Sequence, residues 1–474
     1  MSPALTAILI GAGNRGYEAY GAYALAHPDE MRFVAVAEPH PARRERFARA
    51  HAIPADAQFS TWEELLSKGQ MAGAALVCTL DRLHVEPAVA ALQAGYDVLL
   101  EKPMATTLPD CLRLVQTAER TRRLLQICHV LRYSPFFSAL HDILQSGRLG
   151  QVITVEHREN VAYWHMAHSY VRGNSRNSTV ESPMILSKCC HDLDVLVWNL
   201  GPCRRLSSFG ALTHYREENA PAGAPERCTD GCPAAASCPW YAPRLYLHIV
   251  PLLHVAHSSP LLWERWAARL ILDWPWLASL ARRTIPGLQA ALDYRGWPVS
   301  VISEDMDAQA RQRALETGPY GRCIYRCDNN VVDHEVVSME MTSGATVTLT
   351  MHGHSHREGR TMRYDGTRAT LFATYYPNDH EIQIHDHHSG RVSTLRFPIG
   401  VAGAAGHAGA DHKLMAGFVR AVRDPACALT TARESLQSHL LAFAAEEARL
   451  QGVVVDMEEF GRRAEAEGLP ESAN

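Results

Sequence analysis

The chain has 474 residues, of which 47% are hydrophobic and 20% are charged, and its formal net charge is −5 at pH 7. This length exceeds what one hydrophobic core usually serves, so we expect a globular protein of two domains. The slightly acidic balance argues against a nucleic-acid partner, which requires a concentrated basic face, and favours a small-molecule ligand.

The N-terminal residues run directly into a strand pattern, "TAILI", without the basic segment that opens a signal peptide, so we expect a cytoplasmic protein. "GAGNRG" at 11–16 and a helical pattern follow. In a dinucleotide-binding loop, Gly11 allows the tight turn, Gly13 lets a pyrophosphate approach the backbone, and Gly16 permits close packing of helix on strand. The pattern predicts dinucleotide binding.

The second strand pattern, "MRFVAVA", ends at Glu38, about 20 residues after the last glycine. An acidic side chain at this place accepts hydrogen bonds from the adenosine ribose and repels a 2′-phosphate, which favours NAD. Arg43 and Arg44 follow, either as a solvated helix face or as ligands of a 2′-phosphate. NADP therefore remains open.

A further strand, helix and strand occupy residues 73–100, which predicts a doubly wound parallel sheet with ligands at the carboxyl ends of its strands. Lys102, in "EKPMA" at 101–105, follows the last of these strands. We expect it to meet a ligand there; a surface lysine in a turn is the alternative.

The glycine loop, "EKPMA", "HVLRYSP" at 129–135 and a later His-x-x-Asp on an apolar helix together resemble the Gfo/Idh/MocA family of NAD(P)-dependent oxidoreductases, over roughly residues 5–210 and 318–455. The resemblance implies an N-terminal Rossmann domain (1–128) and a C-terminal α/β domain (129–455) with an open, mainly antiparallel sheet. We expect an insertion at about 225–316 within the second domain and a C-terminal tail over residues 456–474. The family implies a sugar or cyclitol substrate and a homo-oligomer, a dimer or tetramer.

The resemblance also implies roles for single residues. Lys102 would contact the nicotinamide ribose and the substrate hydroxyl, His191 would be the acid/base, and Asp194 would orient it or bind substrate. The family's leading aspartate, four residues before the histidine, is Ser187 here. Serine is no base at neutral pH, so proton abstraction falls to His191 or Lys102, with Lys188 or Asp192 as substitutes.

The complete set of expected site residues follows from these arguments and from the polar stretches at 163–174 and 317–337. Catalytic candidates are Lys102, Tyr163, His165, Lys188, His191 and Asp192. Cofactor-binding candidates are Gly11, Gly13, Asn14, Arg15, Gly16, Glu38, Thr79, His84, Glu101 and Lys102. Substrate-binding candidates are Arg132, His168, Tyr170, Arg172, Asp194, Arg322 and His334.

The stretch "YWHMAHSYVRGN" at 163–174 reads as a loop dense in groups that grip hydroxyls. We expect it to line a pocket; a polar surface loop is the alternative. The segment 406–422 reads as a loop followed by an amphipathic helix that packs back near the first domain.

Cysteines cluster as C-x3-C-x5-C at Cys228, Cys232 and Cys238, with Cys323 or Cys327 as a fourth ligand. Tetrahedral zinc is the simplest closed site for such thiolates, an iron–sulfur cluster is a second option, and reduced, buried cysteines are the alternative. A metal here would pin the insertion. Cys189 and Cys190 are too close along the chain for a relaxed disulfide.

Two other stretches admit alternatives. His352, His354 and His356 alternate and would share one face of a strand, where they bind metal or sugar hydroxyls or simply face solvent. Residues 245–290 are apolar, but charges and prolines interrupt every window of the roughly 20 apolar residues that a membrane span requires. We expect amphipathic helices and no membrane partner.

Three functions fit this sequence. The first is NAD-dependent hydride transfer to or from a ring hydroxyl of a sugar, glycoside or cyclitol. The second is redox-neutral glycoside hydrolysis, in which transient oxidation by NAD acidifies a neighbouring C–H, the aglycone leaves, and water addition and re-reduction follow. The third is a sugar- or NAD-sensing regulator, against which the presence of both Lys102 and His191 argues.

Overall fold

The computed structural model describes residues 3–257, 259, 261–281, 284, 294–303, 305, 307–377, 379–397 and 409–467. Its first sheet is entirely parallel, in the order β3-β2-β1-β4-β5-β6. The strands are β1 (Leu5–Ile10), β2 (Met31–Ala37), β3 (Gln58–Phe59), β4 (Ala74–Val77), β5 (Asp97–Leu100) and β6 (Leu125–Ile127). The strand order reverses between β1 and β4, the place where sheets of this kind bind ligands at the carboxyl ends of the strands.

Helices connect the parallel strands, because a crossover between parallel neighbours requires one. They are α1 (Ala22–Ala26), α2 (Pro41–Ala50), α3 (Trp62–Leu66), α4 (Val85–Gln93) and α5 (Leu108–Thr121), and a π-helical turn over Arg15–Gly21 precedes α1. The central strands are apolar on both faces, as a sheet covered on both sides requires: every residue of β4 is buried. The predicted doubly wound sheet is confirmed.

The second sheet has nine strands in the order β14-β13-β12-β11-β7-β10-β9-β8-β15. Neighbours are antiparallel except β7 and β10, which are parallel. The strands are β7 (Val152–Ala162), β8 (Cys203–Ala211), β9 (His334–Met341), β10 (Thr346–Ser355), β11 (Gly359–Gly366), β12 (Ala369–Tyr376), β13 (Asp379–Asp386), β14 (Val392–Arg396) and β15 (Val455–Asp456). The expected mainly antiparallel sheet is confirmed.

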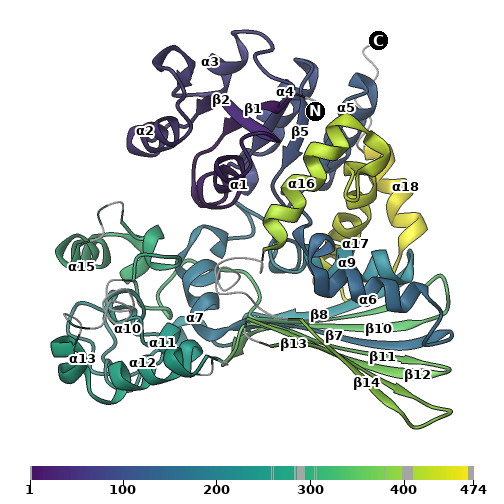
Figure 1. Cartoon of the computed structure of the whole chain (residues 1–474). Helices are drawn as coiled ribbons and strands as arrows, with labels where there is room; N and C mark the ends of the chain where they lie inside the picture. Colours follow the sequence, from purple (N-terminus) through teal and green to yellow (C-terminus); the bar gives the residue numbers. More distant parts are fainter. Residues whose placement is uncertain are drawn as a thin grey trace.

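Figure 1 shows helices between the two sheets, on one side of the nine-stranded sheet. They include α6 (Pro135–Gln145), α9 (Cys190–Leu200), α16 (Ala410–Arg423), α17 (Ala432–Gln451) and α18 (Met457–Glu467). The short helix α8 (Met184–Ser187) contacts α9 and α17. α17 packs against α5, α9 and β8, so it ties the two sheets together. Residues 455–467 form β15 and α18 and pack on β8, so this part of the expected tail is folded.

The insertion forms a helical lobe at one end of the nine-stranded sheet, beside α7 (Tyr163–His165) (Figure 1). Its helices are α10 (Ala242–Tyr246), α11 (Val250–His257), α12 (Leu262–Asp273), α13 (Pro275–Ala281) and α15 (Ala308–Thr317). No helix among the described residues is long and apolar enough to cross a membrane. Residues 163–172 are α7 and a π-helical turn, so the loop expected there is wrong.

Candidate active site

The glycine loop has the geometry of a phosphate cradle. Gly11 has a φ of +95°, and a Cβ there would lie 2.7 Å from the carbonyl oxygen of Cys78. A Cβ on Gly16 would lie 2.2 Å from the carbonyl oxygen of Gly11, so only glycine lets the helix approach so closely. Around Gly13 a Cβ would meet nothing within 4 Å, which leaves the backbone open to a ligand. These properties fit a dinucleotide.

Glu38 follows β2 and is buried beside this loop. Its carboxylate accepts hydrogen bonds from the Ala12 N–H at 2.7 Å and from the His40 N–H at 3.0 Å. Arg44 Nη1 donates to the Glu38 carbonyl oxygen at 2.6 Å, so this guanidinium holds the turn after β2. The negative charge therefore stands at the edge of the loop, where an adenosine ribose would lie.

Arg15, expected at the cofactor, joins the two parts of the chain. Its Nε donates to Glu101 at 2.6 Å, and its Nη2 donates to Asp411 of α16 at 2.6 Å and to Tyr20 at 2.9 Å. Burial opposes ionisation of Glu101, but Arg15 and the Tyr20 hydroxyl outweigh it and hold the pKa of Glu101 below its usual value. The expectation that the 406–422 helix packs near the first domain is confirmed for its described part, 409–422; residues 406–408 lie outside the described residues.

Lys102 reaches from the end of β5 to the second domain. Its Nζ donates to the carbonyl oxygen of Ser187 at 2.9 Å. The turn that carries it is fixed by His84, whose ring nitrogens lie 2.7 Å from the Pro103 carbonyl oxygen and 3.2 Å from that of Thr79. Thr79 and His84 thus shape the turn of the catalytic candidate.

His191 lies in the first turn of α9, in a cluster of buried imidazoles. Its ring contacts that of His129 edge to face, with centroids 5.6 Å apart, and His129 contacts His439 at 5.8 Å. Burial lowers the pKa of His129 to about 4 and that of His439 to about 3, and Lys102 adds to both shifts. These two rings are therefore neutral at pH 7, and the Lys102 ammonium lies close to them.

Asp194, one turn further along α9, is paired with Arg132. Arg132 Nε and Nη2 each donate to one carboxylate oxygen of Asp194 at 2.7 Å. This bidentate pair is buried and attaches α9 to the 3-10 turn at Val130–Tyr133. It supports the helix that presents His191; the predicted substrate contacts of both residues stay predictions.

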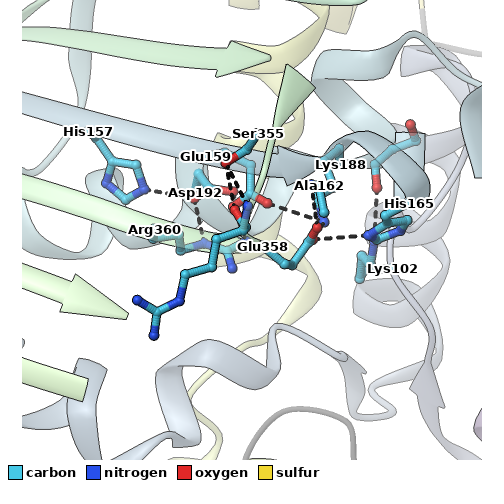
Figure 2. Close-up of polar contacts among 12 residues, drawn as sticks. Lys102, His157, Glu159, Ala162, His165, Lys188, Asp192, Ser355, Glu358 and Arg360 are labelled. Carbon is cyan, nitrogen blue, oxygen red and sulfur yellow. Dashed lines mark hydrogen bonds and ion pairs between the residues drawn. The ribbon is translucent and has the colours of Figure 1, made fainter. Parts of the chain in front are cut away.

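A chain of buried charges continues from α9 into the second sheet (Figure 2). Arg360 donates to Asp192 through Nε at 2.7 Å and lies 2.8 Å from Glu159, its direct partner in the β11–β7 register. Lys188 Nζ lies 3.2 Å from Glu159 and 2.8 Å from Glu358. We call these residues, with His157 at 2.7 Å from Asp192 and His165 at 3.0 Å from Glu358, the buried ion network.

The network fixes which of its members carry charge. Burial disfavours charge throughout, but Arg360 and His157 outweigh it and hold the pKa of Asp192 well below its usual value. Glu358 and Glu159 likewise raise the pKa of Lys188 against the effect of burial. Burial raises the pKa of Glu159 to about 7. Lys188 is thus held as a cation and Asp192 as a paired anion, which disfavours both as the substitute base.

The polar aromatic segment mostly anchors the insertion. His168 Nδ1 lies 2.8 Å from the Tyr246 hydroxyl oxygen, and Tyr163 packs in the apolar cluster around Ala242 and Tyr246. Arg172 donates to the carbonyl oxygens of Arg322 and Trp240. Of this segment, His165 joins the buried ion network, and Tyr170 is buried beside Lys188.

The remaining candidates lie in other surroundings. Arg322 forms an ion pair with Asp328 at 2.8 Å, and His334 lies 2.8 Å from the buried carboxylate of Asp333. His352 and His354 lie on β10, half-buried and exposed, and His356 is exposed beyond the end of this strand, so the expectation that all three share one strand face is wrong. All twelve cysteines are unpaired, Cys189 and Cys190 included. No three His, Cys, Asp or Glu side chains among the described residues are arranged to hold a metal ion, so the geometry does not support the predicted zinc site.

Sequence reasoning missed most partners in this site: Tyr20, His129, His157, Glu159, Glu358, Arg360, Asp411 and His439. Two of them, Glu358 and Arg360, lie in "MHGHSHREGR", a segment that was interpreted through its histidines alone. "HREN" at 157–160 places His157 and Glu159 on one face of a strand, a signal that was available. Nothing in the sequence alone connects Asp411 with Arg15.

The fold and the site define the class: an α/β protein with a doubly wound parallel sheet, a second, mainly antiparallel sheet, and polar residues at the carboxyl ends of the parallel strands. Residues 5–129 match the family model described as "Oxidoreductase family, NAD-binding Rossmann fold" of the Gfo/Idh/MocA group. This match shows that residues 5–129, which hold the parallel sheet, are similar to the NAD-binding part of this family.

Curated relatives match over stretches of about a quarter of the chain. Inositol 2-dehydrogenase 2 of Saccharopolyspora erythraea is 34% identical over 130 residues, 27% of this chain and 35% of that protein. Inositol 2-dehydrogenase of Salmonella typhimurium (strain LT2) is 30% identical over 126 residues, 26% of this chain and 34% of that protein. The chain thus spans about a third of the length of these relatives.

Solved structures match over nearly the whole chain. An oxidoreductase from Agrobacterium radiobacter, solved with NAD+, L-tartaric acid and magnesium, has a TM-score of 0.62 at 13% identity and covers 96% of this chain and 99% of its own. The WlbA dehydrogenase from Chromobacterium violaceum, solved with NADH and UDP-GlcNAcA, has a TM-score of 0.60 at 14% identity, and the match covers 96% of each chain. At these identities the likeness shows the fold alone.

Proposed function

We propose that this chain is an NAD-dependent oxidoreductase that transfers a hydride between nicotinamide and a ring hydroxyl of a sugar or cyclitol. The observation that carries the proposal is the position of the Lys102 ammonium. Lys102 follows β5 of the dinucleotide-binding sheet, and its Nζ donates to the carbonyl oxygen of Ser187 at 2.9 Å, four residues before His191 of α9. The similarity to inositol dehydrogenases supports a polyhydroxylated ring as substrate.

The glycine loop and Glu38 would hold the dinucleotide, which supplies the hydride acceptor when bound. In this proposal the positive charge of Lys102 lies beside the substrate oxygen and stabilises the negative charge of the alkoxide that forms there. His191 accepts the hydroxyl proton at an imidazole nitrogen, because an imidazole titrates near working pH. Glu38 favours NAD over NADP, since its carboxylate would repel a 2′-phosphate.

A turnover assay with defined substrates tests this function. The purified chain is incubated with NAD or NADP and a panel of inositols, hexoses, nucleotide sugars and aryl glycosides, and both nicotinamide reduction and aglycone release are followed. Net NADH from a polyol or sugar supports the proposal. Aglycone release without NADH would establish the hydrolytic alternative instead, and NAD binding without turnover across the panel would point to a sensor.

We further propose that the chain assembles into a homo-oligomer through the nine-stranded sheet. The view in Figure 1 shows helices on one side of this sheet and none on the other. Phe372 of β12 and Val392 of β14 are exposed, at 40% and 54%. Light scattering on a Phe372→Lys variant checks this: a smaller assembly than wild type is expected, and an unchanged mass would contradict the interface.

A further inference from the structure

His165 is a member of the buried ion network that has one ring nitrogen to spare. Its Nδ1 lies 3.0 Å from Glu358 Oε1, and among the described residues none hydrogen-bonds to its Nε2. The side chain is 16% exposed, and Nε2 is not one of the buried polar atoms that lack a partner. A molecule from outside the protein can therefore reach this nitrogen.

The position of the proton on the His165 ring follows from Glu358. Burial opposes ionisation of Glu358, but His165 and Lys188 outweigh it and hold the pKa of Glu358 well below its usual value. An ionised carboxylate only accepts hydrogen bonds, so Nδ1 of His165 is the nitrogen that donates. Burial also lowers the pKa of His165, so the ring is neutral at pH 7 and its Nε2 carries a lone pair. Nε2 is thus an acceptor.

Several contacts fix the orientation of this ring. Glu358 lies in the turn between β10 and β11, and its carboxylate accepts from the Ala162 N–H at 2.7 Å and from Lys188 Nζ at 2.8 Å. Trp297 of the insertion packs edge to face on the His165 ring, with centroids 4.9 Å apart. The acceptor is therefore held in place before a ligand binds, as a residue that selects substrates requires.

His165 lies in the same part of the molecule as Lys102. The Lys102 ammonium is close enough to add to the lowering of the His165 pKa. Figure 2 shows the two side chains at the same end of the buried ion network. Lys102 follows β5 of the parallel sheet, whereas His165 belongs to α7, which follows β7 of the second sheet. A ligand beside Lys102 thus has a fixed acceptor from the second domain nearby.

We propose that His165 is a specificity-determining residue of the site and that Glu358 is its positioning residue. In this inference, which rests on the proposed function, His165 Nε2 accepts a hydrogen bond from a second hydroxyl of the ring whose first hydroxyl is oxidised beside Lys102. Ketone, ether and ionised carboxylate oxygens have no proton to donate. An ammonium group has one, but Lys102 and Lys188 repel it. The substrate therefore carries a free hydroxyl at this second position.

Binding of substrate analogues to the complex with NADH tests the proposal, because an alcohol cannot be oxidised there. The probes are one sugar or polyol that wild type oxidises with NAD and, for each of its other hydroxyls, the deoxy and the deoxyfluoro derivative. Fluorine can accept a hydrogen bond but cannot donate one. At one position wild type is expected to bind both derivatives about 10- to 100-fold more weakly than the parent compound, as measured by calorimetry.

His165→Phe keeps a ring of similar size and removes the acceptor. This variant is expected to bind the parent compound and the two derivatives with the same affinity to within about threefold, because the group that distinguishes them is gone. The control is His248→Phe, which replaces an exposed histidine between α10 and α11 and should discriminate as wild type does.

Glu358→Gln tests the positioning role. A side-chain amide can donate to Nδ1 of His165, which lets the ring proton move to Nε2 and turns the acceptor into a donor. The variant is expected to bind the parent compound more weakly than wild type does and the deoxyfluoro derivative more tightly. A merely structural role of Glu358 would instead weaken the binding of both compounds.

Three outcomes would contradict the inference. If His165→Phe discriminates as wild type does, or if every deoxyfluoro derivative binds wild type as well as the parent compound, no hydroxyl donates to His165, and the proposed function stands without this contact. If wild type oxidises no compound of the panel, the proposed function fails and the inference fails with it. Circular dichroism checks folding, and if His165→Phe does not fold, the measurements on wild type and Glu358→Gln still decide.

Discussion

The Nζ of Lys102 donates a hydrogen bond to the carbonyl oxygen of Ser187 at 2.9 Å, across the boundary between the two sheets. A cation at the end of the dinucleotide-binding sheet is thereby fixed beside the helix that carries His191. The contact depends on the backbone of Ser187, not on its side chain. Substitutions at the two positions should therefore have very different effects.

Lys102→Met is expected to lower kcat by about 10² to 10⁴, because it removes the charge that stabilises the developing alkoxide. NAD binding, measured by fluorescence titration, should change little, since the glycine loop and Glu38 are untouched. The control is Lys68→Ala, which replaces an exposed lysine after α3. If Lys102→Met kept most of its kcat, Lys102 would have no part in the chemistry.

Ser187→Ala is expected to keep kcat within about tenfold of wild type, because a serine hydroxyl is no base at neutral pH. Among the described residues its hydroxyl, which is buried, has no hydrogen-bond partner, so little stability should be lost either. Steady-state kinetics and thermal unfolding measure both effects. A loss of kcat as large as that of Lys102→Met would mean that Ser187 occupies the role of the family's aspartate.

Glu38→Ala is expected to weaken NAD binding by roughly tenfold to a hundredfold, the effect of losing a hydrogen bond to a charged group. NADP binding should improve in the same variant, because the repulsion of a 2′-phosphate disappears. Dissociation constants for both cofactors give the ratio. An unchanged preference would show that Glu38 does not reach the ribose and serves only the Ala12 and His40 amides.

Arg360→Met is expected to destabilise the fold by about 3–5 kcal/mol, because it leaves Asp192 and Glu159 buried without their shared cation. Arg363→Met on the same strand is the control: this exposed arginine pairs with Asp365, and its loss should leave the unfolding midpoint nearly unchanged. The unfolding midpoints of both variants are measured in urea. Equal midpoints would mean that the buried ion network does not contribute to stability.

Stability should fall as the pH drops from about 6.5 toward 4, in part through His129. Burial lowers its folded-state pKa to about 4, so the unfolded chain takes up this proton first. The contribution is therefore present above pH 6.5 and lost as the pH falls, by roughly 3 kcal/mol in all. Its ring faces Asp194, His191, His439, Arg132 and Lys102.

The contribution of His129 is isolated by measuring the free energy of unfolding of wild type and His129→Gln at pH 7 and pH 5. All other groups titrate in both proteins, so their contributions cancel in the comparison. The difference in stability between the two pH values should be smaller in His129→Gln. An identical difference in both proteins would mean that His129 is not held neutral by the fold.

The sequence by itself determined the local features of this protein. The turn at Gly11, the close approach at Gly16, the acidic residue after β2 and the lysine after β5 depend on neighbours within one strand–turn–helix unit, so spacing was enough to predict them. Short apolar runs likewise predicted strands of the parallel sheet, whereas the antiparallel sheet was expected only from the family resemblance.

Only the tertiary structure decided how the charged side chains pair. Asp194 and Arg132 were each expected to bind substrate, and they bind each other. Glu159 meets Arg360 because β7 and β11 pair in one particular register. A buried charge must take whichever partner the packing brings within reach, and that partner can lie hundreds of residues away, as Asp411 does from Arg15.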